Sequence, residues 1–126
     1  MLYRSAQIDS LGCAARRELR NMGIRTIIDL RTPEELNNYP QIQKGFNVVH
    51  IPIATGNMEK VLQGIQEGKI KGDTINRIVE RMNRELVINY RDEYKKLFEL
   101  LLDRNNYPAI IHCSSGKGRT GIASAL

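Results

Sequence analysis

Tryptophan is absent from the 126-residue sequence, and aromatic residues make up only 6% of it. With so few rings, and no run of Lys and Arg interleaved with them, the sequence argues against nucleic acid as a partner. Only two cysteines are present, and Cys13 and Cys113 are too far apart for a metal-ligand spacing. We therefore expect no disulfide framework, no bound metal and no other cofactor.

Long apolar runs are missing as well. No stretch approaches the roughly 20 apolar residues needed to cross a bilayer, so we expect no transmembrane segment. Arg4 and Asp9 interrupt the first ten residues, where a secretory signal would need a continuous apolar stretch. The sequence thus predicts a cytoplasmic protein.

The composition is typical of one globular domain, with 41% hydrophobic residues, 26% charged residues and a net charge of +5. The positive charge favours an anionic partner, but by itself it does not choose between a phosphate, an acidic lipid headgroup and nucleic acid. Because no repeat or linker divides the chain, we expect a single domain over residues 1–126.

Helical and extended patterns alternate along the chain. Ser10 is a suitable N-cap for a helix that continues to Met22, and the β-branched segments 24–30 and 46–53 predict buried strands separated by a polar loop. Helical spacing returns over 58–65 and 75–86, with Asp73 as the N-cap of the second helix. We interpret these two helices either as cover for the core or as a lid over the functional site.

A third helical stretch covers residues 90–103, with a core-facing stripe formed by Tyr90, Tyr94, Leu97, Phe98 and Leu101. The short strand 109–112 then leads into a Gly-rich loop and a last helix. This order predicts an α/β fold with a central, mostly parallel sheet flanked by helices. Because the last helix ends within about two turns, we expect the C-terminal helices of the domain to be missing from this chain.

The segment HCSSGKGRTG, residues 112–121, carries the strongest chemical signal. If the five residues between Cys113 and Arg119 wrap into a semicircle, their N–H groups point inward and the Arg119 guanidinium closes a ring around a phosphoryl group. Gly116 and Gly118 would allow so tight a turn. The positive end of the following helix favours both a bound dianion and the thiolate form of Cys113.

This arrangement predicts hydrolysis of a phosphomonoester in two steps. Cys113 attacks phosphorus to give a cysteinyl phosphate, which water then hydrolyses. By placement, Thr120 would hydrogen-bond the sulfur and His112 would orient the loop. The phosphoryl oxygens would bind Arg119 and the loop amides, which belong to Ser114, Ser115, Gly116, Lys117 and Gly118.

HCSSGKGRTG resembles the signature loop of the cysteine-dependent protein tyrosine phosphatase superfamily, and LYRSAQ and GIRTIIDLRTPEE are similar to segments of its bacterial, dual-specificity-like branch. The resemblance covers most of the chain and implies a metal-independent phosphatase acting on phosphoproteins. The loop is also similar to that of the phosphatase and tensin homologue group, which implies phosphoinositide substrates. Gly118 stands where many members of the bacterial branch have Asp.

Members of the superfamily also carry a general acid, an Asp on a mobile loop after the strand equivalent to residues 46–53. Residues 54–59 of this chain contain no Asp. Glu59, Asp73 and Asp92 are candidates, but each has an alternative role as a helix cap or a charge on a helix. The general acid therefore stays unassigned.

Other charged residues have structural interpretations. Asp29, Arg31 and Glu35 are expected to form a charge network at the end of a strand, and Arg4 is expected to have a structural role. Lys117 is either a solvated lysine or a second cation for a polyanionic substrate.

Three other functions are alternatives to a phosphatase. A nucleotide P-loop needs Gly five positions before its Gly-Lys pair and Ser or Thr after it, where this chain has Ile111 and Gly118. A rhodanese-like sulfur-transfer domain also has a Cys-centred anion loop, but residues 117–121 fit the phosphatases better. A phosphate- or phosphoinositide-binding module with weak catalysis is the alternative to an enzyme.

Overall fold

A computed structural model describes residues 1–40, 44–56 and 58–126, without the side chains of residues 58–60 and 62. Four parallel strands form one sheet in the order β1-β4-β2-β3. The strands are β1 (Leu2–Ser5), β2 (Thr26–Asp29), β3 (Asn47–His50) and β4 (Ala109–His112). The predicted α/β fold with a parallel central sheet is confirmed.

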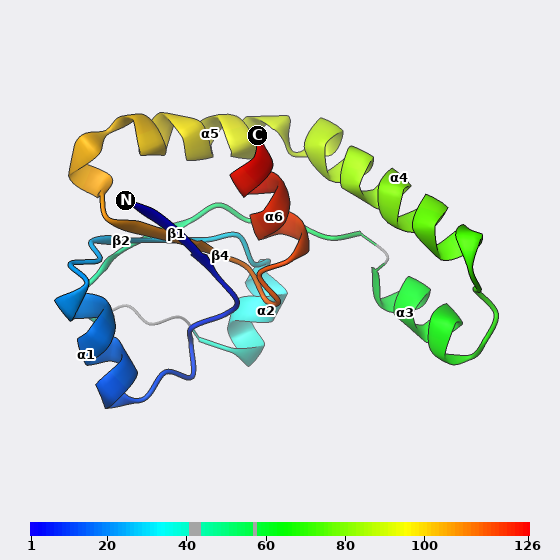
Figure 1. The fold of residues 1–126 in the computed structure, drawn as a ribbon, viewed down its shortest axis with the longest axis horizontal. Coiled ribbons are helices and arrows are strands. Elements are labelled where there is room, and N and C mark those ends of the chain that lie inside the picture. The colour runs from blue at the N-terminus through cyan, green and yellow to red at the C-terminus, as the bar shows by residue number, and fades with distance from the viewer. Residues whose placement is uncertain (41–43, 57) are drawn as a thin grey trace.

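Six α-helices and one 3-10 helix are described around this sheet. They are α1 (Cys13–Asn21), α2 (Pro33–Asn38), α3 (Met58–Gln66), α4 (Asp73–Asn89), α5 (Arg91–Leu102), η1 (Arg104–Asn106) and α6 (Gly118–Ala125). Figure 1 shows α1 and α2 on one side of the sheet and α5 and α6 on the other. None of the helices in the described residues is long and apolar enough to span a membrane.

Alternating side chains of the central strands fill two separate cores. Ile27 and Ile110 point toward α1 and pack with Ile8 and Ile24. The alternate residues Ile28 and Ile111 pack on the opposite face with Tyr94 and Leu97 of α5, Ala123 of α6 and Cys113. This period of two follows from the pleat of a strand, and burial on both faces explains why the strands are continuously apolar.

Three elements were not predicted from the sequence, namely β1, α2 and the 3-10 helix η1. β1 is too short to show a clear pattern, and pairing with β4 along its whole length places it in the sheet. The predicted polar loop after β2 begins with α2, whose start has a capping box: the Thr32 hydroxyl accepts from Glu35 N–H, and the Glu35 carboxylate accepts from Thr32 N–H. Pro33 at the first helical position also favours this start.

Three local predictions are wrong. α1 begins at Cys13 after Gly12, not at Ser10, and it has no side-chain cap. Asp73 is the first residue of α4 rather than its N-cap, which is Gly72 with φ +51°. Phe98 belongs to the predicted core stripe but is 39% exposed, because α5 turns Tyr94 and Leu97 toward the sheet instead.

Helices α3 and α4 extend away from the sheet as an arm (Figure 1). Within α4 only Leu86, near the end that joins α5, is buried. The interpretation of these helices as cover for the core therefore holds only for this end of α4.

Candidate active site

The Gly-rich loop lies at the carboxyl end of the central strands. The strand register aligns Ser5, Asp29 and His50 with His112, the last residue of β4. Residues 113–117 connect β4 to α6 directly after this row. Ligands of open parallel sheets bind at this edge, so the topology alone favours the loop as the site.

Gly116 determines how the loop folds. Its φ is +70°, and a Cβ at this position would lie 2.5 Å from the carbonyl oxygen of Ser5. The Gly116 N–H donates to the Sγ of Cys113 over 3.3 Å, so the loop folds back over the thiol. Gly118 differs from the prediction, because its φ is not positive and a Cβ there would meet nothing within 4 Å.

The segment that follows β1 supports the loop from the side. Gln7 N–H donates to the carbonyl of Ser114 at 3.0 Å, and the Arg4 guanidinium donates to the carbonyl of Gly116 at 2.8 Å. These contacts agree with the structural role expected for Arg4. Because two loop carbonyls are bound on this outer side, the peptide groups between them are held in fixed orientations.

Several loop amides remain available for an anion. Within the described residues, the N–H groups of Ser114, Ser115 and Lys117 donate no hydrogen bond. The first N–H groups of α6 follow at once, and a helix start leaves such groups without partners inside the helix. Unpaired amides beside a helix N-terminus form a suitable site for a phosphoryl group. No cluster of three possible metal ligands is found in the described part of the chain.

Arg119 is held in place from three directions. Its side chain is almost fully buried, and its Nη1 donates to the carbonyls of Leu30 at 3.1 Å and Ile53 at 3.0 Å. Glu35 accepts from Nη1 at 2.7 Å and from Nη2 at 2.8 Å. Nη2 also donates to the Ser114 hydroxyl at 3.2 Å, and the Nε–H has no oxygen acceptor among the described residues.

Glu35 is the site residue that the sequence analysis missed. It was expected to join Asp29 and Arg31, but its carboxylate binds Arg119 and accepts from the Ser114 hydroxyl. The signal that could have found it is the capping box, which places Glu35 in the first turn of α2. Burial alone would raise the pKa of Glu35, but hydrogen bonds from Arg119, Ser114 and the Thr32 N–H outweigh burial and lower it to about 2.

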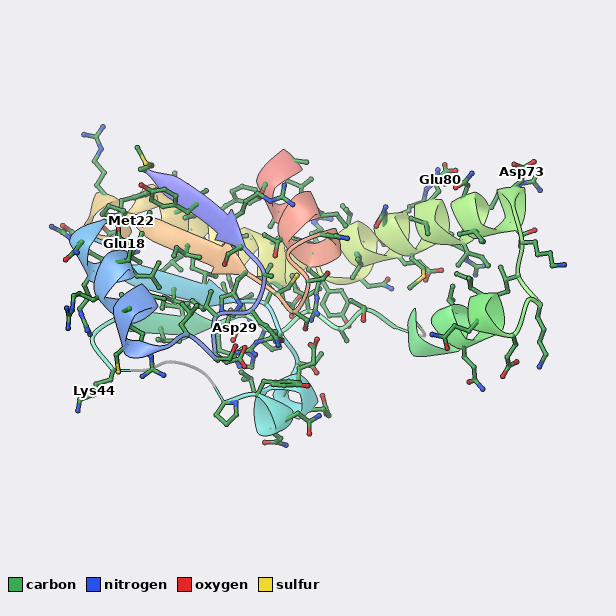
Figure 2. The ribbon with its side chains drawn as sticks, turned by 60° about the horizontal axis from the view of Figure 1, so that its bottom comes forward. Glu18, Met22, Asp29, Lys44, Asp73 and Glu80 are labelled. Atoms are coloured by element: carbon green, nitrogen blue, oxygen red, sulfur yellow. The ribbon has the colours of Figure 1, made fainter. Side chains whose placement is uncertain are left out.

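Asp29 and Arg31 do form the expected structural pair. The Arg31 guanidinium binds both carboxylate oxygens of Asp29, the shortest contact being 2.8 Å, and both side chains are fully buried. Asp9 adds a longer contact to Arg31 at 3.4 Å. This network lies on the α1 side of the sheet, and Figure 2 labels Asp29 within it.

His112 lies between this network and the loop. Its Nδ1 is 3.3 Å from the carbonyl oxygen of Cys113, and its Nε2 is 3.5 Å from Asp29 without forming a hydrogen bond. Complete burial lowers the pKa of His112, although the charge of Asp29 acts in the opposite direction. The ring is therefore neutral at pH 7 and contacts the loop backbone, as a loop-orienting residue would.

The other predicted site residues differ in how far they are exposed to solvent. Cys113 is 2% exposed and belongs to the core cluster beneath α5 and α6. The Thr120 hydroxyl is buried, and no hydrogen bond to the sulfur or to another described atom is found for it. Ser115 and Lys117 are exposed, so Lys117 remains compatible with a solvated lysine or with a second cation.

The structure does not bring the candidate general acid Asp73 to the loop. Asp73 lies at the tip of the arm, far from the sheet (Figure 2). Asp92 is exposed in the first turn of α5. The side chain of Glu59 lies outside the described residues. The described geometry therefore assigns no general acid.

Comparison with known families gives a match over the length of the chain. The model of the tyrosine phosphatase family matches residues 1–126. The match includes the loop between β4 and α6 and the segments that support it.

Proposed function

The chain belongs to the tyrosine phosphatase family, and on that premise we propose that it is a phosphomonoesterase in which Cys113 is the nucleophile and Arg119 the phosphate clamp. Phosphatase activity follows from the family. The observation that supports these residue roles is the loop itself, where a buried thiol lies beside unpaired amides and a fixed guanidinium.

In the first step the Sγ thiolate of Cys113 attacks phosphorus, and the bond to the ester oxygen breaks. The organic group leaves either as a phenolate or, with a proton taken from the solvent, as an alcohol or phenol, and a cysteinyl phosphate remains. In the second step water attacks phosphorus, a proton is lost to the solvent, and the S–P bond breaks to release phosphate and the thiolate. Water must reach the loop for this step, so the organic product leaves first.

Arg119 and the loop amides stabilise the charge on the equatorial oxygens in both transition states. The donors already have fixed positions, because carbonyls and Glu35 hold the guanidinium and β1 holds the loop. Little reorganisation is then needed when charge develops. Glu35 acts as a positioning residue, since it binds the outer edge of Arg119 and leaves Nε–H for the substrate.

The substrates are phosphorylated proteins, with phosphotyrosine alone or with dual specificity, or phosphoinositides. The proposed reaction needs a reduced Cys113 thiol, which fits a cytoplasmic location.

A test compares phosphate release from an activated aryl phosphate and from a phosphoinositide, using wild type and Cys113→Ser. An activated aryl group leaves without protonation, whereas a lipid alkoxide needs a general acid. We expect turnover of the aryl ester that the substitution abolishes. Unchanged turnover in Cys113→Ser would contradict the proposed nucleophile.

A phosphate-binding module with weak catalysis is a second candidate function. The observation that favours it is the position of Asp73 at the tip of the arm, away from the loop. This alternative predicts that wild type binds inorganic phosphate but releases none from either ester.

A further inference from the structure

A cavity of about 420 Å³ lies between α3, α4 and residues 54–56. Cavities of roughly 300–1,000 Å³ are of the size that holds small organic ligands. Val61, Ile78, Met82 and Leu86 supply an apolar wall, and Arg81 and Glu85 supply charged groups. None of the residues that line this cavity belongs to the Gly-rich loop, so the cavity is a separate feature of the surface.

The cavity is nevertheless joined to the loop by two connections. Ala54, in its lining, directly follows Ile53, whose carbonyl accepts from Arg119 at 3.0 Å. Two other lining residues, Leu86 and Tyr90, pack in the hydrophobic cluster that contains Cys113. Residues 51–56 lead from the sheet toward the arm (Figure 1). A ligand in the cavity would therefore lie one residue away from Ile53, whose carbonyl helps to hold the guanidinium.

The charges of the lining indicate what kind of group fits. Arg81 donates to Glu85 at 2.9 Å, so the two charged side chains among the described lining residues pair with each other. The described part of the lining thus has no surplus positive charge for additional phosphates. An apolar wall with a neutral polar edge favours an uncharged aromatic or aliphatic group.

We propose that this cavity is a subsite for the uncharged, largely apolar organic group of the phosphomonoester, while the Gly-rich loop holds its phosphate. The inference rests on the proposed function and adds a basis for substrate specificity, because the arm then selects substrates by the organic group of the ester. A polyphosphorylated inositol would place charged groups against the apolar wall, at the cost of desolvating them.

The test compares phenyl phosphate with biphenyl-4-yl phosphate, two esters of phenols with similar acidity. Their chemical steps are matched, so a difference in kcat/KM reports contacts of the second ring. We expect wild type to favour the biphenylyl ester by about tenfold or more, as burial of an added apolar group predicts. A ratio near one, or a higher kcat/KM for a polyphosphorylated inositol, would overturn the subsite.

Matched tryptophan substitutions test whether the second ring of the biphenylyl ester binds in the cavity. Ile78→Trp fills the cavity and should lower the biphenylyl-to-phenyl ratio about tenfold. Val79→Trp makes the same change at a neighbouring residue that is 42% exposed and outside the lining, and it should retain the wild-type ratio. Val61→Trp fills the cavity from α3 and replaces Ile78→Trp if that variant fails to fold. An unchanged ratio in a folded filling variant would contradict the proposal.

Binding to Cys113→Ser separates this proposal from the proposed function. If wild type hydrolyses neither these two esters nor an activated aryl phosphate, the proposed function fails, but about tenfold tighter binding of biphenyl-4-yl phosphate than of phenyl phosphate still supports the subsite. If both esters bind equally, the subsite is wrong, even where Cys113-dependent turnover of phenyl phosphate supports the proposed function.

Discussion

Gly116 packs so closely against Ser5 that a single added methyl group would lie 2.5 Å from the Ser5 carbonyl oxygen. The contact joins the Gly-rich loop to the end of β1, a segment 111 residues earlier in the sequence. Since that carbonyl is backbone, a flexible side chain cannot move away to relieve the clash. The shape of the loop therefore depends on β1 as well as on its own glycines.

This contact predicts a large effect of Gly116→Ala. The loop must shift by a substantial part of an ångström, which displaces the amides from the phosphoryl oxygens, and the positive φ adds about 1 kcal/mol of strain. We expect kcat/KM for an aryl phosphate to fall about 100-fold. Gly12→Ala, where a Cβ meets nothing within 4 Å, serves as the control. Similar activities of the two variants would contradict the proposed function of the loop backbone.

Glu35→Gln tests the clamp on Arg119. The substitution replaces one anionic acceptor by an amide N–H that points at a guanidinium, so Arg119 loses its fixed orientation. We expect kcat/KM to decrease about 10- to 100-fold, with weaker binding of inorganic phosphate. Glu34→Gln changes a neighbouring carboxylate on the same helix turn and is the matched control. Equal activity of both variants would contradict the positioning role of Glu35.

The buried His112 predicts a pH dependence of stability. Its pKa in the folded state is lowered by burial below the ordinary value of 6.5, so the unfolded state binds its proton more readily. The contribution of His112 to the free energy of unfolding is fully present above about pH 6.5. It decreases as the pH falls below this value, by at most about 1.4 kcal/mol per pH unit. Denaturant unfolding between pH 7.5 and 5.5 measures this slope. A His112→Gln variant with the wild-type slope would show that His112 is not its source.

The sequence was sufficient to predict the central part of the fold. The apolar runs of β2 and β4 mark strands buried on both faces, whereas β3, at the edge of the sheet, is only partly buried. The spacing of α4 and α5 marks helices. The loop between β4 and α6 was placed by its Cys-x5-Arg spacing. These features are local, because each depends on residues adjacent in the chain.

Relationships between distant residues could not be predicted in this way. Glu35 and Arg119 are 84 positions apart, and only the parallel order of the sheet brings α2 to the end of β4. The support of Gly116 by Arg4 likewise depends on the pairing of β1 with β4. The start of α2 is a different case, since Thr32 and Glu35 show a capping box in the sequence itself.

The most direct measurement is rapid-quench mass spectrometry of the peptide that contains Cys113, during turnover of an activated aryl phosphate. The proposed mechanism predicts a transient mass increase of one phosphoryl group on this peptide, formed in a burst with the phenol and absent in Cys113→Ser. Turnover by wild type without any phosphoryl group on Cys113 would contradict the account.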